Sequence, residues 1–383
     1  MTSLPAGFRA HVANIGIKDD TDDFVVIAAD QPCAASAVFT KSRFSGPSVA
    51  LSRSHVAGGA LRAFVVISKN ANVATGDHGL ADAEEVVQGV ATAIGCAPDD
   101  VLIASTGVIG RRYPMDKVRA HLALLPRRFD GADAEPAARG IMTTDTFAKV
   151  ASASVGAASV VGIAKGVGMI EPDMATLIAL FLTDASVEVG VLDAMFRRVM
   201  DHTLNAVSVD TDTSTSDTAA IMASGAAGHV DVLELETALD AVALSLTRQI
   251  ARDGEGATKL LTVTVDGARD EQQAKRVAKA IVNSPLVKTA VHGADPNWGR
   301  VAMAVGKCSD DTDIAQDDVV IRFGGQELYP KPVGDDDLAA LTKYLAGDDV
   351  LIHVSLGIGT AAFTVYGCDL SDGYVRINAD YTT

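Results

Sequence analysis

The residues with the greatest chemical potential lie in short polar clusters, outside the common catalytic motifs. These clusters combine hydroxyl, amide and charged side chains and cover residues 70–72, 105–107, 142–146, 165–176, 253–256, 295–300 and 378–383. A Thr or Ser hydroxyl in such a cluster can act as a nucleophile only beside a base, and Lys or Glu can bind a group of opposite charge. Each cluster alone is an ordinary turn, so the information lies in their order along the chain.

Several other kinds of site are excluded by spacing. Residues 165–168 read KGVG and match neither the GxGxxG nor the GxxxxGK[ST] phosphate-binding pattern. In the acidic run 210–217, Thr215 and Ile221 replace the Gly and the Glu that a calcium loop requires, which favours a hydroxyl-rich turn or cap. The eight histidines form no metal-ligand pair, and no GxSxG elbow occurs. The sequence therefore implies no metal, nucleotide or organic cofactor.

Strands and helices throughout the chain must position these clusters. Short β-branched runs predict buried strands at 24–29, 63–68, 101–105, 260–265, 319–323, 350–355 and 362–366. Apolar residues at helical spacing predict helices over 83–94, 235–250, 274–282 and 337–345. The predicted fold is therefore mixed α and β.

The segment 151–185 is the most unusual part of the chain. Its small residues lead to Gly166 and Gly168, which indicate a tight turn or a close approach of the backbone to another group. Pro172 then interrupts any helix, and an apolar, strand-like run covers 176–182. The pattern by itself favours a hairpin in the core of a sheet.

Composition limits the class of protein. A chain of 383 residues with 48% hydrophobic residues predicts one large or two intermediate cores. The net charge of −17 argues against general binding to nucleic acids or anionic membranes. The first twenty residues contain no apolar signal region, no stretch is long enough to span a bilayer, and the four cysteines are widely spaced. We expect a soluble, cytosolic protein with reduced thiols.

The order of the polar clusters resembles the ornithine acetyltransferase family, the glutamate N-acetyltransferases. The similarity covers the chain from Gly16 to Thr383, and its most specific parts are IASTGVIG, IMTTDT, AKGVGMIEPDMAT, DGEGATK, SPLVKTAVHGADPNWGR and NADYTT. The segment 171–176, with the sequence EPDMAT, resembles the same segment of the paralogue associated with clavulanic acid gene clusters. Since typical arginine-pathway members differ at Glu171 and often at Asp173, both arginine biosynthesis and a clavulanic-acid-type cluster remain open as the pathway.

The resemblance implies that the chain cleaves itself between Ala175 and Thr176. Thr176 would then begin a second chain, with its hydroxyl as the nucleophile and its free α-amine as the base. An unperturbed α-amine has a pKa of about 7.7–8.0, so an appreciable fraction is neutral near pH 7. Before cleavage, the same hydroxyl would attack the carbonyl of Ala175, and Gly166 and Gly168 would permit the strained backbone that this attack needs.

The resemblance also assigns the remaining site residues. Thr106 and Gly107 would stabilise the oxyanion of each tetrahedral intermediate. Lys165 would bind a carboxylate and Glu255 the δ-ammonium of ornithine. Together with Thr176, the residues that would line the substrate site are Thr143, Lys165, Glu255, Asn378 and Thr383.

The reaction implied is ping-pong transfer of acetyl from N2-acetyl-L-ornithine to L-glutamate. The expected fold is the layered helix–sheet sandwich that this family shares with the L-aminopeptidase/D-esterase group. Residues 1–175 and 176–383 would form an α and a β chain sharing one core, with a smaller C-terminal α/β subdomain from about 260, and would assemble as α2β2 or larger. Three alternatives remain open: a hydrolase of the same fold, a bifunctional enzyme that also uses acetyl-CoA, and a non-catalytic amino-acid-binding protein.

Overall fold

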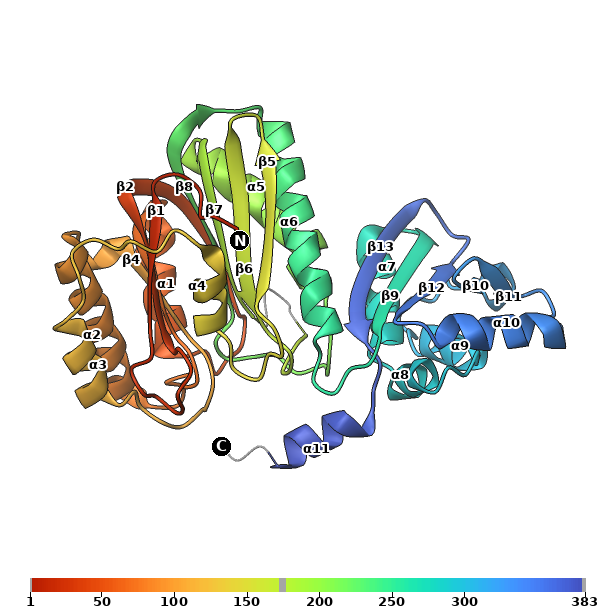
Figure 1. The fold of residues 1–383 in the computed structure, drawn as a ribbon. Coiled ribbons are helices and arrows are strands. Elements are labelled where there is room, and N and C mark those ends of the chain that lie inside the picture. The colour runs from red at the N-terminus through yellow and green to blue at the C-terminus, as the bar shows by residue number, and fades with distance from the viewer. Residues whose placement is uncertain (1, 172–176, 381–383) are drawn as a thin grey trace.

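Two β-sheets organise the computed structural model, which describes residues 2–171 and 177–380 (Figure 1). The strands are β1 (Phe8–Ala13), β2 (Phe24–Phe39), β3 (Ala60–Ile67), β4 (Val101–Ser105), β5 (Lys149–Val155), β6 (Ala158–Lys165), β7 (Ile178–Ser186), β8 (Thr218–His229), β9 (Leu260–Ala268), β10 (Val320–Phe323), β11 (Gln326–Tyr329), β12 (Asp349–Ser355) and β13 (Ala361–Cys368). The helices are α1 (Pro47–His55), α2 (Gly76–Ile94), α3 (Met115–Leu122), α4 (Ala134–Gly140), α5 (Val189–His202), α6 (Val232–Arg252), α7 (Glu271–Val282), α8 (Pro285–His292), α9 (Trp298–Gly306), α10 (Asp335–Leu345) and α11 (Asp372–Asp380).

The first sheet is mixed and is buried on both faces. Among the described residues its strand order is β4-β3-β2-β8-β7-β6-β5, with β1 paired to β2. The pairs β3–β4 and β7–β8 are parallel, and the other pairs are antiparallel. Because helices cover both faces, the central strand β7 is apolar on both faces along most of its length rather than alternating with polar residues.

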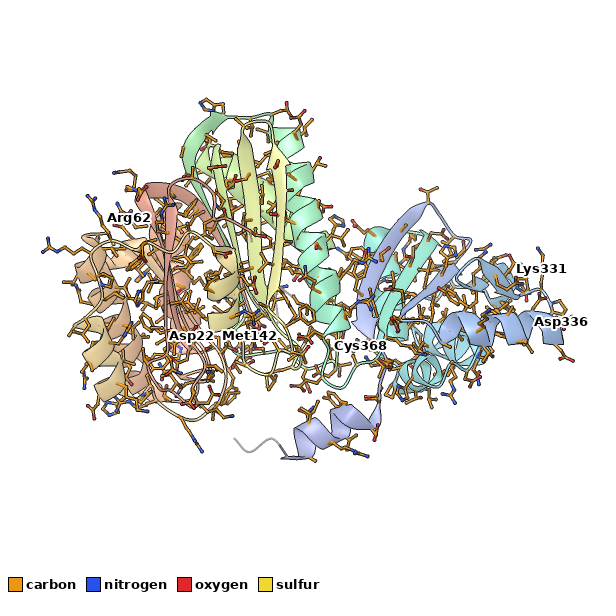
Figure 2. The ribbon with its side chains drawn as sticks, viewed as in Figure 1. Asp22, Arg62, Met142, Lys331, Asp336 and Cys368 are labelled. Atoms are coloured by element: carbon orange, nitrogen blue, oxygen red, sulfur yellow. The ribbon has the colours of Figure 1, made fainter. Side chains whose placement is uncertain are left out.

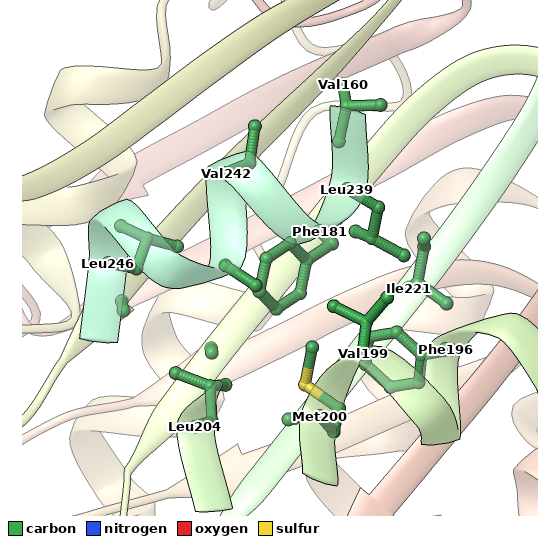
Figure 3. Packing of buried hydrophobic residues seen from close by; sticks show 14 of the residues in the cluster. Val160, Phe181, Phe196, Val199, Met200, Leu204, Ile221, Leu239, Val242 and Leu246 are labelled. Carbon is green, nitrogen blue, oxygen red and sulfur yellow. The ribbon is translucent and has the colours of Figure 1, made fainter. Parts of the chain in front are cut away.

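The core beside the site is built around Phe181 of β7. Figure 3 shows its ring between side chains of α6 and those of α5, and it meets the ring of Phe196 edge-on at a centroid distance of 5.8 Å. Gly162 on the neighbouring strand β6 leaves room for this packing, since a Cβ there would lie 2.8 Å from atoms of Val242 and Leu246. The opposite face of β7 presents Leu180 to a second core that includes α4. These contacts fix the strands whose ends carry the polar clusters.

The second sheet is built from residues 260–368. Within the described part of the chain its order is β11-β10-β12-β9-β13, and α7 packs on β9 and β13. Figure 1 shows the second sheet beside the first. In Figure 2, Cys368 marks the place where the chain leaves the second sheet, and Lys331 and Asp336 lie on the side of this unit that is far from the first sheet. Helix α11 then runs back below α6, in the direction of the first sheet (Figure 1).

The predicted mixed α/β fold is confirmed. Each strand and helix expected from apolar runs and helical periodicity is present, and the hairpin expected in 151–185 is the antiparallel pair β6–β7. Two expectations of turns are wrong. Asn378 lies in helix α11, and Trp298 begins helix α9, because both segments are held by contacts with distant parts of the chain.

Candidate active site

Five of the seven polar clusters converge on one cavity of about 170 Å³. Strand β4 ends just before Thr106, β6 ends at Lys165, and β7 begins directly after Leu177. The described residues that line the cavity are Thr106, Gly107, Ile109, Thr143, Thr144, Lys165, Val167, Gly168, Met169, Leu177, Ile178, Ser214, Thr215, Ser216, Asp217, Glu255 and Asn378. Six of them were predicted from the sequence as site residues.

Lys165 is a buried cation at the floor of the cavity. Its Nζ lies 3.3 Å from the Thr106 hydroxyl, and only 8% of the residue is exposed. Burial lowers the pKa of Lys165, while the neighbouring carboxylate of Asp145 acts in the opposite direction. A buried ammonium is well suited to bind a carboxylate, because a substrate anion would replace the lost hydration.

Glu255 forms another wall of the cavity and is held from two sides. The Thr144 hydroxyl donates to Oε1 at 3.1 Å, and the Asn378 amide donates to Oε2 at 2.9 Å. Gly168 leaves room for the Glu255 carboxylate, since a Cβ at residue 168 would lie 2.5 Å from Oε2 of Glu255. The cavity therefore has an ammonium on one side and a carboxylate on another, as binding of a diamino acid requires.

Gly107 follows β4 in a conformation that other residues rarely adopt. Its φ is +127°, and a Cβ would lie 2.2 Å from the carbonyl carbon of Lys69. The segment that carries Lys69 pairs with this turn through bridges from Asn70 to Thr106 and to Val108. The cluster at 70–72 thus supports the cavity from outside rather than lining it.

A buried ionic network lies behind the cavity and was not predicted from the sequence. Lys149 donates to Asp145 at 2.7 Å and to Asp253 at 2.5 Å, and the three side chains are at most 3% exposed. Asp145 also accepts from the backbone N–H groups of Gly166 at 2.7 Å and Thr143 at 3.1 Å. Burial opposes ionisation of Asp145, but Lys165 and Lys149 hold the pKa of its carboxyl below the usual value.

The segment after Lys165 is fixed by contacts between its own groups and side chains of neighbouring segments. Asp210 accepts from the backbone N–H groups of Met169 and Ile170, each at 2.7 Å. The Glu171 carboxylate accepts from the Asn283 amide at 2.7 Å and lies 3.5 Å from the ammonium of Lys279, both at or near the end of α7. The second sheet unit therefore contacts the segment that leads towards the predicted cleavage site.

The residues 214–217 form a further wall that the sequence did not reveal. They belong to the acidic, hydroxyl-rich run predicted to be a turn or cap, and Ser214, Thr215, Ser216 and Asp217 all line the cavity. Thr40 anchors this wall, because its hydroxyl donates to the Ser214 carbonyl at 2.7 Å and its N–H to the Asp217 carbonyl at 3.1 Å. A cluster of hydroxyl groups in an acidic run was the available signal.

The cysteines are poor candidates for an acyl carrier. All four are free thiols, and burial raises the pKa of Cys33 to about 12 and that of Cys96 to about 11. Burial also raises the pKa values of Cys308 and Cys368. A thiol acts as a nucleophile in its thiolate form, so burial makes all four groups weaker nucleophiles close to neutral pH.

The structure brings together Thr106, Gly107, Thr143, Lys165, Glu255 and Asn378 from distant parts of the sequence. Ala175, Thr176 and Thr383 lie outside the described residues. The cluster 295–300 is not among the described residues that line the cavity, and it covers the end of the α8–α9 connection and the first residues of α9 in the second unit. Within residues 2–171 and 177–380, no group of His, Cys, Asp or Glu is arranged to hold a metal ion, and no helix could cross a membrane.

The chain is similar to known proteins over nearly its whole length. A family model described as ArgJ matches residues 9–383. The chain belongs to the ArgJ family. A relative named Glutamate N-acetyltransferase Oat2, from Streptomyces clavuligerus, is 59% identical over 99% of this chain and 98% of its own length.

Other ArgJ relatives carry names that agree with the enzyme class expected from the sequence. A protein of Nostoc sp. named Arginine biosynthesis bifunctional protein ArgJ 2 is 55% identical over 100% of this chain and 99% of its own length. The crystal structure of the Arginine biosynthesis bifunctional protein argJ of Bacillus halodurans is 40% identical. It covers 52% of this chain and 96% of that chain, with a TM-score of 0.48.

Proposed function

We propose that this ArgJ-family chain is a glutamate N-acetyltransferase that transfers acetyl from N2-acetyl-L-ornithine to L-glutamate through an acetyl ester on Thr176. The observation that carries the proposal is the convergence of six predicted residues on one cavity. Leu177, which is covalently bonded to Thr176, lines the same cavity. The names of the relatives agree with this activity.

The first half-reaction forms the ester. The α-amine of Thr176 takes the proton of its own hydroxyl, and the hydroxyl oxygen attacks the acetyl carbonyl of N2-acetylornithine. Thr106 and Gly107 stabilise the oxyanion, the C–N bond breaks, and the proton passes to the departing amine of ornithine. Lys165 binds the α-carboxylate of ornithine, and Glu255 binds its δ-ammonium.

The second half-reaction regenerates Thr176. The neutral amine of glutamate attacks the ester carbonyl, and the C–O bond to Thr176 breaks. The proton lost by the amine passes through the Thr176 α-amine to the Thr176 oxygen, and N-acetyl-L-glutamate leaves. Glutamate carries a carboxylate where ornithine carries an ammonium, so this end of the cavity must also offer hydrogen-bond donors. Among the described residues, the hydroxyl of Thr144 and the amide of Asn378 are donors beside Glu255. One cavity can thereby accept both amino acids in turn.

The nucleophile is generated when the chain cleaves itself between Ala175 and Thr176. The resulting α chain, 1–175, and β chain, 176–383, remain in one core, with a C-terminal subdomain from about 260, and assemble as α2β2 or larger. The location of Leu177 at the cavity supports cleavage at this position, since the new chain would begin one residue earlier.

Intact-mass measurement and N-terminal sequencing test the proposal. Two fragments of about 18 and 21 kDa are expected, in proportion to 175 and 208 residues of the 39.5 kDa chain, and the larger should begin Thr-Leu-Ile-Ala. Incubation with acetylornithine should add one acetyl group to that fragment, and glutamate should remove it. Full-length protein that transfers acetyl, or a Thr176→Ala variant with full activity, would refute the mechanism.

A second activity, acetylation of glutamate by acetyl-CoA, is a candidate because several relatives are named bifunctional. The measurement is formation of N-acetylglutamate from acetyl-CoA without acetylornithine. Formation that depends on Thr176 would support bifunctionality, and its absence would restrict this chain to transfer between amino acids.

A further inference from the structure

The Asp145/Lys149/Asp253 network connects the parts of the cavity that contact the two ends of a substrate. Asp145 holds the N–H of Gly166, the residue after Lys165, and the N–H of Thr143. Asp253 lies two residues before Glu255 and accepts from both the N–H and the hydroxyl of Thr146. Lys149 joins the two carboxylates. The network thereby connects three segments: 143–146, 165–166 and 253–255.

We propose that this network sets the separation between Lys165 and Glu255 and so determines which length of diamino acid the cavity accepts. The inference rests on the proposed function, in which these two residues bind the carboxylate and the distal ammonium of ornithine. Asp145, Lys149 and Asp253 are positioning residues, because they act through Lys165 and Glu255.

Burial and charge make the network a rigid spacer. Its charges are almost completely excluded from water, so each depends on the others for its stability, and breaking one contact leaves an uncompensated charge. Lys149 also lies 4.9 Å from the ring centroid of Phe147, which further restricts its position. The arrangement therefore tolerates little relative motion between the segments that it joins.

Two contacts extend the spacer from the network to the cavity wall. The Glu255 N–H donates to the Val167 carbonyl at 2.9 Å, which ties the segment 253–255 to the segment after Lys165. The Thr144 hydroxyl, from the segment that Asp145 and Asp253 both hold, donates to the Glu255 carboxylate at 3.1 Å. A shift of 143–146 would therefore move the Glu255 carboxylate relative to the Lys165 ammonium.

The test compares ornithine with diamino acids that are one methylene shorter or longer. Discrimination by one methylene is typically about 10–200-fold, and we expect wild type to prefer N2-acetylornithine over N2-acetyllysine and N2-acetyl-2,4-diaminobutyrate within this range. In Asp253→Asn the ratio of kcat/KM between these substrates should fall about tenfold or more, mainly through KM. Binding of the three free diamino acids, measured by thermal shift, should lose the same preference.

Two further variants keep the inference falsifiable. The double variant Lys149→Met/Asp253→Asn removes one charge of each sign, so it keeps the net charge of the buried site unchanged and serves as the second test if Asp253→Asn does not fold. Asp23→Asn is the matched control. Asp23 is a fully buried carboxylate that accepts two backbone N–H groups, at 2.7 Å each, and is not among the described residues that line the cavity.

The outcomes separate this inference from the proposed function. Loss of chain-length preference in the network variants, with the preference kept in Asp23→Asn, supports it. A preference within twofold of wild type in both network variants would overturn it, as would a wild type that binds the three diamino acids equally. A wild type that prefers ornithine in the thermal-shift assay but transfers no acetyl would instead refute the proposed reaction and leave the binding test decisive.

Discussion

Replacing Gly168 with Ala should weaken binding of the distal ammonium without destabilising the fold. The new Cβ would lie 2.5 Å from Oε2 and 2.6 Å from Cδ of Glu255, so the carboxylate must retreat by about 1 Å to reach an ordinary contact distance. The Glu255 side chain can swing away at little cost, and the backbone of Gly168 is not left-handed. The hydrogen bonds from Thr144 and Asn378, at 3.1 and 2.9 Å, would lengthen or break.

The size of the loss follows from the charge-assisted contact that the displaced carboxylate would make with ornithine. Such a contact contributes about 1.5–3 kcal/mol, so kcat/KM for N2-acetylornithine should fall about 10- to 150-fold. Steady-state kinetics and thermal unfolding are the assays. Gly306→Ala in α9 is the control, because, apart from its chain neighbours and the backbone of its own helix, no atom of the described residues lies within 4 Å of the position that its new Cβ would take. A Gly168→Ala variant with unchanged kcat/KM would refute the assignment of Glu255 to the distal ammonium.

Three further changes address the same cavity. Burial lowers the pKa of Lys165 below its ordinary value of 10.5, so binding of acetylornithine should weaken as the pH rises through that lowered pKa. Lys165→Arg should remove this alkaline decrease from the pH profile of kcat/KM, because the guanidinium group stays protonated. Glu255→Gln should still permit self-cleavage but lower kcat/KM for acetylornithine about 10- to 100-fold, and unchanged kinetics would contradict the contact. Gly107→Ala should destabilise the protein by more than about 3 kcal/mol in urea unfolding, because its Cβ would meet the Lys69 backbone at 2.2 Å; wild-type stability would show that this turn has room.

Local patterns in the sequence predicted most of the elements. The apolar run after Leu177 predicts a strand, and the apolar stripe from Leu235 to Ile250 predicts a helix. Both predictions succeed because the spacing of apolar residues within each segment indicates which of its side chains are buried. Helix α11 was missed because its sequence, with Val375 and Ile377 exposed, has no clear apolar face. Its contacts to the cavity, such as Asn378 with Glu255, come from a distant segment.

The candidate site was predicted through motifs rather than through geometry. The family resemblance identified six residues that share the cavity, but it did not identify the network behind them. Lys149 and Asp253 are 104 positions apart, and an ion pair over such a separation leaves no periodic signal in a single sequence. The wall at Ser214 and Asp217 was missed for a related reason, since a hydroxyl-rich run looks like a turn until Thr40 is seen to anchor it.

The pairing of β6 with β7 has a consequence for recovery from denaturation. The two strands share a register from Val160 opposite Thr183 to Lys165 opposite Ile178, and the predicted cut lies in the connection between them. An uncut chain forms this hairpin as an intramolecular event. After cleavage, separated fragments would have to find each other in solution, so refolding would become second order and would slow in proportion to dilution. The cleaved protein would then remain folded because it unfolds slowly, and not because it refolds readily.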